Sequence, residues 1–216
     1  LNALRPGAVV VDMSSINPNA SREFYQTVKA HGGSYMDAPV SGGEQGAIDG
    51  KLTIMVGGDD ADFDRVKDLL LCMGRVAVHV GGIGSGNVTK CANQIITASN
   101  LAAVGEALTF AAKAGVDPRK VYDAIKGGMA QSAMFDSKFE KIIGRDFKPG
   151  FKLDLNIKDL KNVLSAAQAF GTPVTLTTDC YEMMMMLIQQ GLGQDDNCSI
   201  VKYYEQCAGT EVKEVR

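Results

Sequence analysis

The sequence contains no tryptophan, only two histidines and no concentration of positive charge. The histidines, His31 and His79, lie far apart without the spacing of metal ligands, so we predict no metal site. Lys and Arg number 22 against 25 Asp and Glu, and they are dispersed along the chain. A formal net charge of −3 gives no electrostatic support for a nucleic-acid partner or an acidic membrane surface, so we expect neither.

The sequence also lacks paired cysteine motifs and continuous apolar runs. Its five cysteines are an odd number without a close C-x-x-C pair, which predicts reduced thiols and a cytoplasmic protein rather than a disulfide framework. No apolar run approaches the roughly 18–20 residues that a membrane span requires. With 45% hydrophobic and 22% charged residues, the composition is typical of a soluble globular protein.

The first residues suggest that the chain begins inside a larger protein. Leu rather than Met stands first, and Leu1-Asn2-Ala3-Leu4 reads as the end of a helix that started earlier.

The chain up to about Gly81 is predicted to form an α/β unit. Short apolar runs predict strands over residues 8–13, 34–40, 51–56 and 76–80. One helix is predicted from Pro18 to Ala30 with Asn17 as its N-cap, and another is capped by Asp59-Asp60 and ends before Gly74. Strands that alternate with helices or short loops indicate a mixed α/β sheet.

Nearly everything after Gly81 is predicted to be helical. A stretch without proline from Gly86 to about Ala114 predicts one unusually long helix. Glycines and prolines then separate further helices over residues 118–126, 133–143, 155–170, 174–190 and 197–207. We therefore predict an α/β domain over residues 1–83 and an all-helical domain over residues 84–216, joined by the long helix.

The first candidate site is the loop Ser41-Gly42-Gly43, which follows the strand ending Asp37-Ala38-Pro39-Val40. Glycines allow backbone N–H groups to converge on an anion, and the serine hydroxyl is a further donor for a carboxylate. On spacing alone, an ordinary strand-to-loop turn explains the same residues better.

The second candidate is the segment from Gly82 to Gln94, GIGSGNVTKCANQ. It is not the dinucleotide fingerprint G-x-G-x-x-G, because Asn87 stands where the third glycine is required. It is not a P-loop either, because no glycine immediately precedes Lys90. Glu106 lies at the distance of a ribose-binding acid, but it falls inside the long helix rather than at the end of a strand.

Lys90 remains as the chemically notable residue of this segment. A cation in the first turns of a helix is disfavoured by the helix dipole, so its pKa is expected to fall from about 10.4 toward neutrality if the site is also desolvated. Such a lysine can donate and accept a proton near neutral pH. Asn93 and Gln94 could orient it or bind a substrate hydroxyl. The alternative is an exposed lysine that only solubilises the helix.

A third candidate is Phe151 followed by Lys158-Asp159 near the start of a helix. Taken alone, the Lys–Asp pair is better explained as a solvated surface pair.

These three segments together resemble the β-hydroxyacid dehydrogenase family. The resemblance rests on DAPVSGG at Asp37–Gly43, GIGSGNVTKCANQ at Gly82–Gln94 and FKPGFKLDLNIKDL at Phe147–Leu160, in family order and spacing. It is strongest to the branch of tartronate semialdehyde reductase and 3-hydroxyisobutyrate dehydrogenase. It implies the second half of a Rossmann-type domain followed by an all-α domain like the C-terminal domain of 6-phosphogluconate dehydrogenase, and a homodimer or homotetramer.

The resemblance also implies roles for individual residues. Lys90 falls on the catalytic lysine that protonates the carbonyl oxygen as the hydride arrives. The implied substrate contacts are Ser41, Gly42 and Gly43 for the carboxylate, with Asn93, Gln94 and Phe151 around it. The implied contacts of the cofactor, NADP or NAD, are Ser15 near the nicotinamide, Lys158 and Asp159.

Two departures from the family pattern accompany the resemblance. Gln94 stands where members often have Asn, with Asn93 before it, so either amide could contact substrate. Members begin with a strand, G-x-G-x-x-G and a helix that bind the pyrophosphate, and this chain shows no such segment. We therefore expect a fragment that holds most substrate residues and is inactive by itself.

The function that follows is NAD(P)-dependent reduction of a small carboxylate-bearing semialdehyde, from tartronate semialdehyde to glycerate, with 3-hydroxyisobutyrate dehydrogenase as the alternative. Two other classes stay open. A Schiff-base lyase would also need a lysine of low pKa. A fragment that serves only as a helical dimerisation module would need no chemistry.

Overall fold

The structure is a computed structural model that describes residues 3–214. The chain forms two compact units. The sheet unit comprises Leu1–Gln94 and Lys161–Pro173, and the helical unit comprises Ile95–Leu160 and Val174–Arg216. The helix end expected at residues 1–4 lies partly outside the described residues, and Ala3 and Leu4 are not helical.

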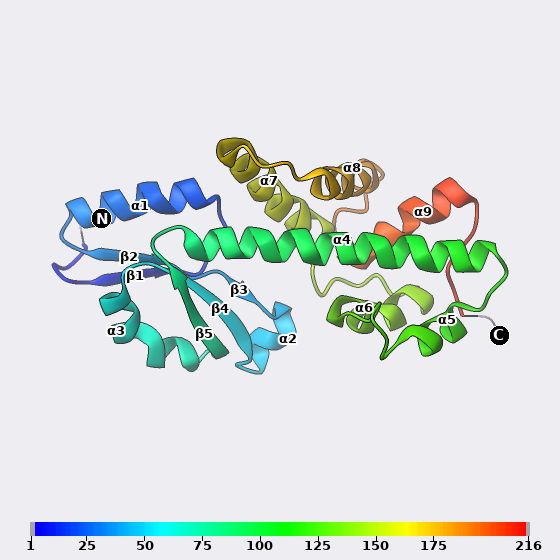
Figure 1. Ribbon diagram of the computed structural model, residues 1–216, viewed down its shortest axis with the longest axis horizontal. Helices are drawn as coiled ribbons and strands as arrows, with labels where there is room; N and C mark the ends of the chain where they lie inside the picture. Colours follow the sequence, from blue (N-terminus) through cyan, green and yellow to red (C-terminus); the bar gives the residue numbers. More distant parts are fainter. Residues whose placement is uncertain (1–2, 215–216) are drawn as a thin grey trace. The chain divides into compact units, whose positions relative to one another are not determined.

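The sheet unit is built on a mixed sheet of five strands, where four strands were predicted (Figure 1). Its strands are β1 (Val9–Asp12), β2 (Ser34–Asp37), β3 (Val40–Ser41), β4 (Leu52–Gly57) and β5 (Gly74–Gly81). β1 pairs with β2 and β4 with β5, both in parallel, and the two parallel pairs meet where β2 and β3 lie antiparallel to β4.

The single strand predicted over residues 34–40 is divided into β2 and β3. Asp37 pairs with Gly57 and Val40 pairs with Ile54, so both pieces keep one register along β4. The main-chain N–H of Met55 donates to the carbonyl of Pro39 at 3.0 Å between them. Because proline has no N–H to donate to the neighbouring strand, the strand is interrupted at that residue. Its two pieces nevertheless run in the same direction beside β4.

Three helices lie wholly in the sheet unit: α1 (Pro18–Ala30), α2 (Gly43–Ile48) and α3 (Asp60–Leu71). Asn17 caps α1 as predicted, with its Oδ1 accepting from the N–H of Asn19 at 2.8 Å. Asp59 makes no side-chain cap bond to α3, contrary to the prediction. α2 was not predicted, because its two glycines weaken the helical pattern.

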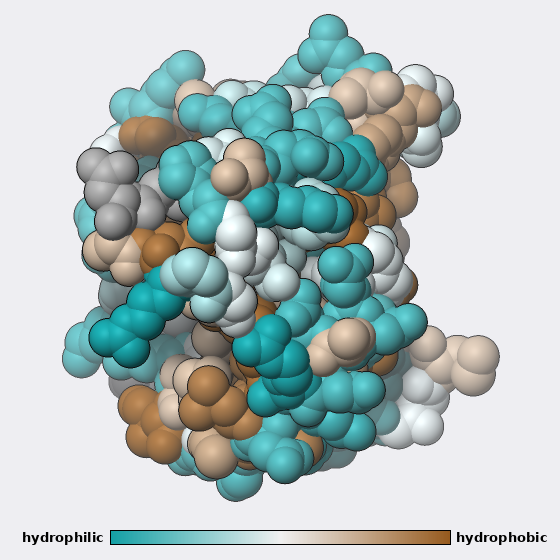
Figure 2. All heavy atoms as spheres, turned by 90° about the vertical axis from the view of Figure 1, so that its left-hand side faces the viewer, coloured by the Kyte–Doolittle hydropathy of each residue, from teal (hydrophilic) through white to brown (hydrophobic). Residues whose placement is uncertain are grey.

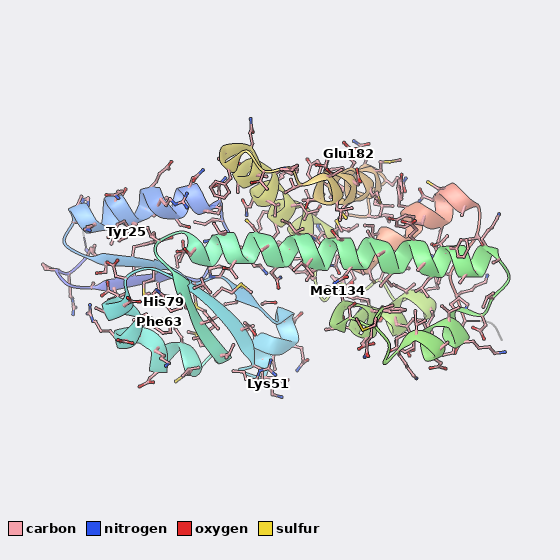
Figure 3. All side chains as sticks on the ribbon, in the orientation of Figure 1. Tyr25, Lys51, Phe63, His79, Met134 and Glu182 are labelled. Carbon is pink, nitrogen blue, oxygen red and sulfur yellow. The ribbon has the colours of Figure 1, made fainter. Side chains whose placement is uncertain are left out.

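In Figure 1, α1 and α3 lie on opposite sides of the strands, as expected of helices that cross between parallel strands. α3 is fixed to β5 by ring stacking: Phe63 lies 5.1 Å from the His79 ring, and Figure 3 shows the two side by side. Between the layers lies an apolar core around Met36, Ile54 and Leu70. The end face in Figure 2 is mostly hydrophilic, with hydrophobic residues gathered at a few places.

Two helices contribute to both units. α4 (Ser85–Lys113) is the predicted long helix, and α7 (Leu153–Phe170) has its first part in the helical unit and its last part in the sheet unit. By length and composition alone, α4 could also cross a membrane, since its best window has a mean hydropathy of 1.4. The sequence analysis looked for a continuous apolar run and found none. Polar residues interrupt the run in α4, but the mean hydropathy of the window stays high enough to pass a test of length and composition. A buried core helix passes the same test.

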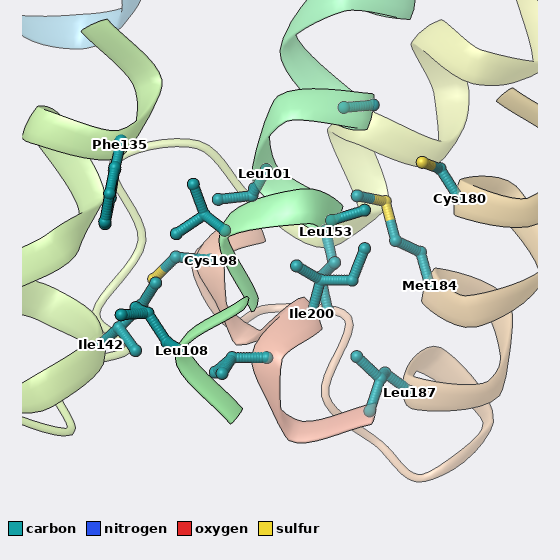
Figure 4. Packing of buried hydrophobic residues seen from close by; sticks show 14 of the residues in the cluster. Leu101, Leu108, Phe135, Ile142, Leu153, Cys180, Met184, Leu187, Cys198 and Ile200 are labelled. Carbon is teal, nitrogen blue, oxygen red and sulfur yellow. The ribbon is translucent and has the colours of Figure 1, made fainter. Parts of the chain in front are cut away.

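The helical unit surrounds its own core. Its remaining elements are α5 (Pro118–Ile125), α6 (Ala133–Ile143), α8 (Thr175–Gln189), a 3-10 helix over Asn197–Ile200 and α9 (Val201–Ala208). Asp117 and Ser132 cap α5 and α6 by accepting from main-chain N–H groups. Figure 4 shows the core, in which Leu101, Leu153 and Ile200 are fully buried.

Candidate active site

The beginning of α4 is fixed by a buried carboxylate. Asp37, at the end of β2, accepts from the N–H of Gly84 at 2.7 Å and from the N–H of Asn87 at 2.6 Å. These are donors that a helix start leaves without helical partners. Burial raises the pKa of the Asp37 carboxyl above its ordinary value, although the hydrogen bonds from Asn87 and Gly84 oppose that shift. The first two sequence motifs therefore meet at Asp37.

The glycines of the second motif allow this close approach. A Cβ on Gly86 would lie 2.5 Å from the carbonyl oxygens of both Asp37 and Met55. Gly84 has φ +86°, a conformation that favours glycine. These glycines are thus required to pack the helix start against the sheet.

Lys90 lies in the second turn of α4, near the start of a helix as the sequence predicted. Its side chain is half-buried. One turn further, Asn93 donates from Nδ2 to Oε1 of Gln94 at 2.9 Å, and Gln94 is 5% exposed. The two amides that the sequence left as alternatives are therefore a bonded pair. The roles predicted for all three residues stay predictions.

Ser41, Gly42 and Gly43 connect β3 to the short helix α2. Gly42 has φ +140° and Gly43 has φ +63°, so both adopt conformations that other residues rarely take. A Cβ on Gly42 would also lie 3.1 Å from Leu52. Gly42 and Gly43 are exposed and Ser41 is half-buried, so the loop is accessible in the sheet unit. Carboxylate binding by this loop stays a prediction.

Ser15 lies in the turn that follows β1. Asp12 organises this turn: its Oδ1 accepts from the N–H of Ser14 at 2.9 Å, and its Oδ2 accepts from the Tyr35 hydroxyl at 2.7 Å. Burial opposes ionisation of Asp12, but the hydrogen bonds from Ser14 and Tyr35 lower the pKa of its carboxyl. The turn stands at the carboxyl end of a parallel strand, where α/β sheets bind their ligands.

Phe151, Lys158 and Asp159 belong to the helical unit. Phe151 is half-buried just before α7. Lys158 Nζ lies 2.9 Å from Asp159 Oδ1, with side-chain exposures of 51% and 5%. Because Asp159 is buried, the pair is not the fully solvated surface pair that the sequence favoured. The role of the pair in binding cofactor stays a prediction.

Asp196, which holds the main chain beside Phe151, was not predicted from the sequence. Its buried carboxylate accepts from Gly150 N–H at 2.8 Å, from Phe151 N–H at 3.2 Å and from Lys138 Nζ at 2.7 Å. Burial opposes ionisation, but the Lys138 ammonium and the N–H groups lower the pKa of this carboxyl. The only signal in the sequence was the N-cap position of Asp196 before the last helices.

Two family models match most of the chain. Residues 1–82 match the NAD-binding domain of 6-phosphogluconate dehydrogenase. Residues 84–204 match the model described as NAD-binding of NADP-dependent 3-hydroxyisobutyrate dehydrogenase. Both models describe NAD-binding regions, which confirms the predicted NAD or NADP cofactor.

Individual proteins agree with the family models. The chain is 46% identical to 2-hydroxy-3-oxopropionate reductase of Escherichia coli K12 over 94% of this chain and 69% of that protein. It is 35% identical to 2-(hydroxymethyl)glutarate dehydrogenase of Eubacterium barkeri over 98% of this chain and 71% of that protein. The solved 3-hydroxyisobutyrate dehydrogenase of Mycobacterium tuberculosis superposes with a TM-score of 0.86 at 28% identity, covering 93% and 71% of the two chains.

The turn around Ser15 carries groups of the chemical kind that could bind the nicotinamide end of such a cofactor. The turn around Ser15 is partly exposed, follows a parallel strand and carries two consecutive hydroxyls at Ser14 and Ser15. A planar, uncharged amide of the kind that nicotinamide carries can be bound by hydroxyl and main-chain groups. The predicted fold class, an α/β Rossmann-type part followed by a helical part, is confirmed by the same comparisons. The chain belongs to the β-hydroxyacid dehydrogenase family of NAD(P)-dependent oxidoreductases.

Proposed function

We propose that the protein reduces a small aldehyde that carries a carboxylate, with tartronate semialdehyde (2-hydroxy-3-oxopropionate) as substrate and glycerate as product. The similarity to the reductase of that substrate at 46% identity supports this choice. The three relatives are named for acids in which a CH₂OH or CHO group sits on the carbon next to a carboxylate. We infer that this arrangement is the substrate class.

In the proposed mechanism the Ser41–Gly43 loop holds the substrate carboxylate with main-chain N–H groups and the serine hydroxyl. A reduced nicotinamide cofactor, when bound, would supply the hydride that the carbonyl carbon accepts. Lys90 donates a proton to the carbonyl oxygen, so that CHO becomes CH₂OH and the lysine is left neutral until solvent reprotonates it. Asn93, Gln94 and Phe151 would contact the rest of the substrate, while Ser15, Lys158 and Asp159 would contact the cofactor.

One observation carries the proposal most directly. Lys90 lies one turn after Asn87 on the helix start that Asp37 holds against the sheet, and the Ser41 loop begins four residues after Asp37. The Asp37 carboxylate therefore links the helix start that carries the proposed acid to the strand that leads into the proposed carboxylate loop, and such fixed placement is the kind of preorganisation that proton transfer requires.

The test is Lys90→Ala in the intact protein, assayed with tartronate semialdehyde. Loss of a positioned general acid should lower kcat by roughly 10²–10⁴-fold, while cofactor binding stays near the parent value. Lys51→Ala is the matched control, because the Lys51 side chain is 67% exposed in the same unit. Near-normal turnover in Lys90→Ala would show that the assignment is wrong.

A second candidate is 3-hydroxyisobutyrate dehydrogenase, favoured by the match of residues 84–204 and by the fold of the Mycobacterium tuberculosis enzyme. Its semialdehyde has a methyl where tartronate semialdehyde has a hydroxyl. The two candidates are separated by comparing kcat/KM for both aldehydes with NADH and with NADPH.

The other two function classes are tested on the same preparation. Borohydride trapping of a substrate adduct on Lys90 would favour a Schiff-base lyase over a reductase. Failure of the intact protein to bind either cofactor in a titration would favour a dimerisation module.

A further inference from the structure

One peptide group, between Ser15 and Ile16, is held on both of its edges by side-chain amides. The N–H of Ile16 donates to Oδ1 of Asn87 at 3.1 Å. The carbonyl of Ser15 accepts from Nδ2 of Asn162 at 3.2 Å. All four residues belong to the sheet unit, although they are brought from three distant parts of the sequence. A peptide bonded on both edges cannot rotate without breaking one of these bonds.

The amide of Asn87 is itself fixed. Asn87 is 1% exposed, its Nδ2 donates to the Ser21 hydroxyl at 3.0 Å, and its main-chain N–H donates to Asp37 at 2.6 Å. Because Ile16 N–H can only donate, the oxygen of the amide must face it, which determines the orientation of the group. Asn87 therefore connects the helix that carries Lys90 to the turn that carries Ser15.

The second hydrogen bond to this peptide comes from Asn162, in the last part of α7. Asn162 and Ser165 lie three residues apart on one face of that helix. Ser165 accepts from Nδ2 of Asn17 at 2.8 Å, so two successive turns of α7 hold residues 15–17. Lys158, the other proposed cofactor contact, precedes Asn162 by one turn of the same helix.

We propose that Asn87 and Asn162 are positioning residues that set the orientation of Ser15 toward the nicotinamide of the bound cofactor. The inference rests on the proposed role of Ser15. Neither amide takes part in the chemistry. Each acts through the Ser15–Ile16 peptide, and together they align the cofactor contact with the helix that carries the proton donor.

The experiment compares Asn87→Leu and Asn162→Leu with the parent in the intact protein. Both variants should raise the dissociation constant of NADPH or NADH, measured by fluorescence titration, by roughly 3–10-fold, the effect of one hydrogen bond. Both should also raise the primary deuterium isotope effect on kcat/KM measured with 4-deuterated cofactor, because a misaligned hydride transfer becomes slower relative to the other steps. A purely structural loss would leave that isotope effect unchanged.

Two control variants remove hydrogen bonds that do not involve the Ser15–Ile16 peptide or the residues that hold it. Thr89→Val takes away the hydroxyl that donates to the carbonyl of Ser85 at 2.8 Å, and Thr109→Val the buried hydroxyl that donates to the carbonyl of Gly105 at 2.7 Å. Both should lower Tm and leave cofactor binding within two-fold of the parent, on the order of experimental scatter. Parent-like cofactor binding and isotope effects in the two Leu variants overturn the inference, as do equal effects in the controls.

Failure of the proposed function would look different from failure of this inference. A parent protein that binds cofactor but reduces neither aldehyde contradicts the proposed substrate. The cofactor titrations then still test whether Asn87 and Asn162 position Ser15. If Asn87→Leu does not fold, Asn162→Leu decides the question, because Asn162 is only half-buried.

Discussion

Asp37 and Asp196 are both fully buried, and each accepts hydrogen bonds from main-chain N–H groups. They differ in the cause that dominates the pKa of the carboxyl. Asp196 is paired with the Lys138 ammonium, which lowers the pKa of the carboxyl despite burial, whereas burial raises the pKa of Asp37. The same residue type therefore contributes to stability with opposite dependence on pH.

Asp196→Asn should lower the free energy of unfolding by about 3–5 kcal/mol at neutral pH, because it leaves the Lys138 ammonium, 12% exposed, without its anion. A carboxyl whose pKa is lowered in the folded state stabilises above its ordinary pKa and loses that effect as pH falls through the lowered value. The difference between parent and variant should therefore shrink from about pH 5 downward, in urea titrations at stepped pH.

Asp37→Asn provides the contrast. A carboxyl with a raised pKa contributes its stability at low pH and loses it as pH rises through the folded value. The difference curve of this variant should slope in the opposite direction, from about pH 4 upward. If the two difference curves slope alike, the opposite causes given for the two carboxylates are wrong.

At the scale of the element, two aspartates that both stand at the N-cap of a helix differ in whether the side chain makes a cap bond. Asp117 accepts from the N–H of Arg119 at 2.9 Å, whereas Asp59, with a similar extended backbone, makes no side-chain cap bond. Asp117→Ala should cost about 1 kcal/mol in urea unfolding, and Asp59→Ala should stay within about 0.5 kcal/mol. Equal losses in both variants would rule out the cap bond as the cause.

Most elements could be predicted because their signals are local. Caps, prolines and glycines predicted α1 and placed α6 at its observed bounds, Ala133–Ile143. The signals failed where pairing across the chain decides the outcome. α2 forms despite its glycines, and the break at Pro39 is visible only against β4. The contact of Asn87 with Ile16 spans 71 residues, so no local pattern could show it.

At the scale of the whole molecule, each unit has its own apolar core. Phe139 and Ile54 are fully buried in the helical and sheet units, respectively. Phe139→Ala should cost about 3–5 kcal/mol and Ile54→Ala about 2–5 kcal/mol, since each leaves a cavity. In hydrogen exchange, each variant should first expose the amides of its own unit, with α4 and α7 responding to both.

Phe110→Ala is the control for these core variants. Phe110 is 76% exposed on α4, so its removal should change stability by less than about 0.5 kcal/mol. Loss of protection spread evenly over both units in Phe139→Ala would contradict separate cores.

The return of α7 into the sheet unit has a consequence for synthesis on the ribosome. The sheet unit needs Lys161–Pro173, which are translated long after Gln94. At ~5–20 residues per second, the first part of the unit waits on the order of 4–16 s for its last helix turns. During that interval the Ser15 turn lacks its bonds to Asn162 and Ser165. The nascent chain therefore completes the hydrogen bonds of the Ser15 turn only after most of the helical unit has been synthesised.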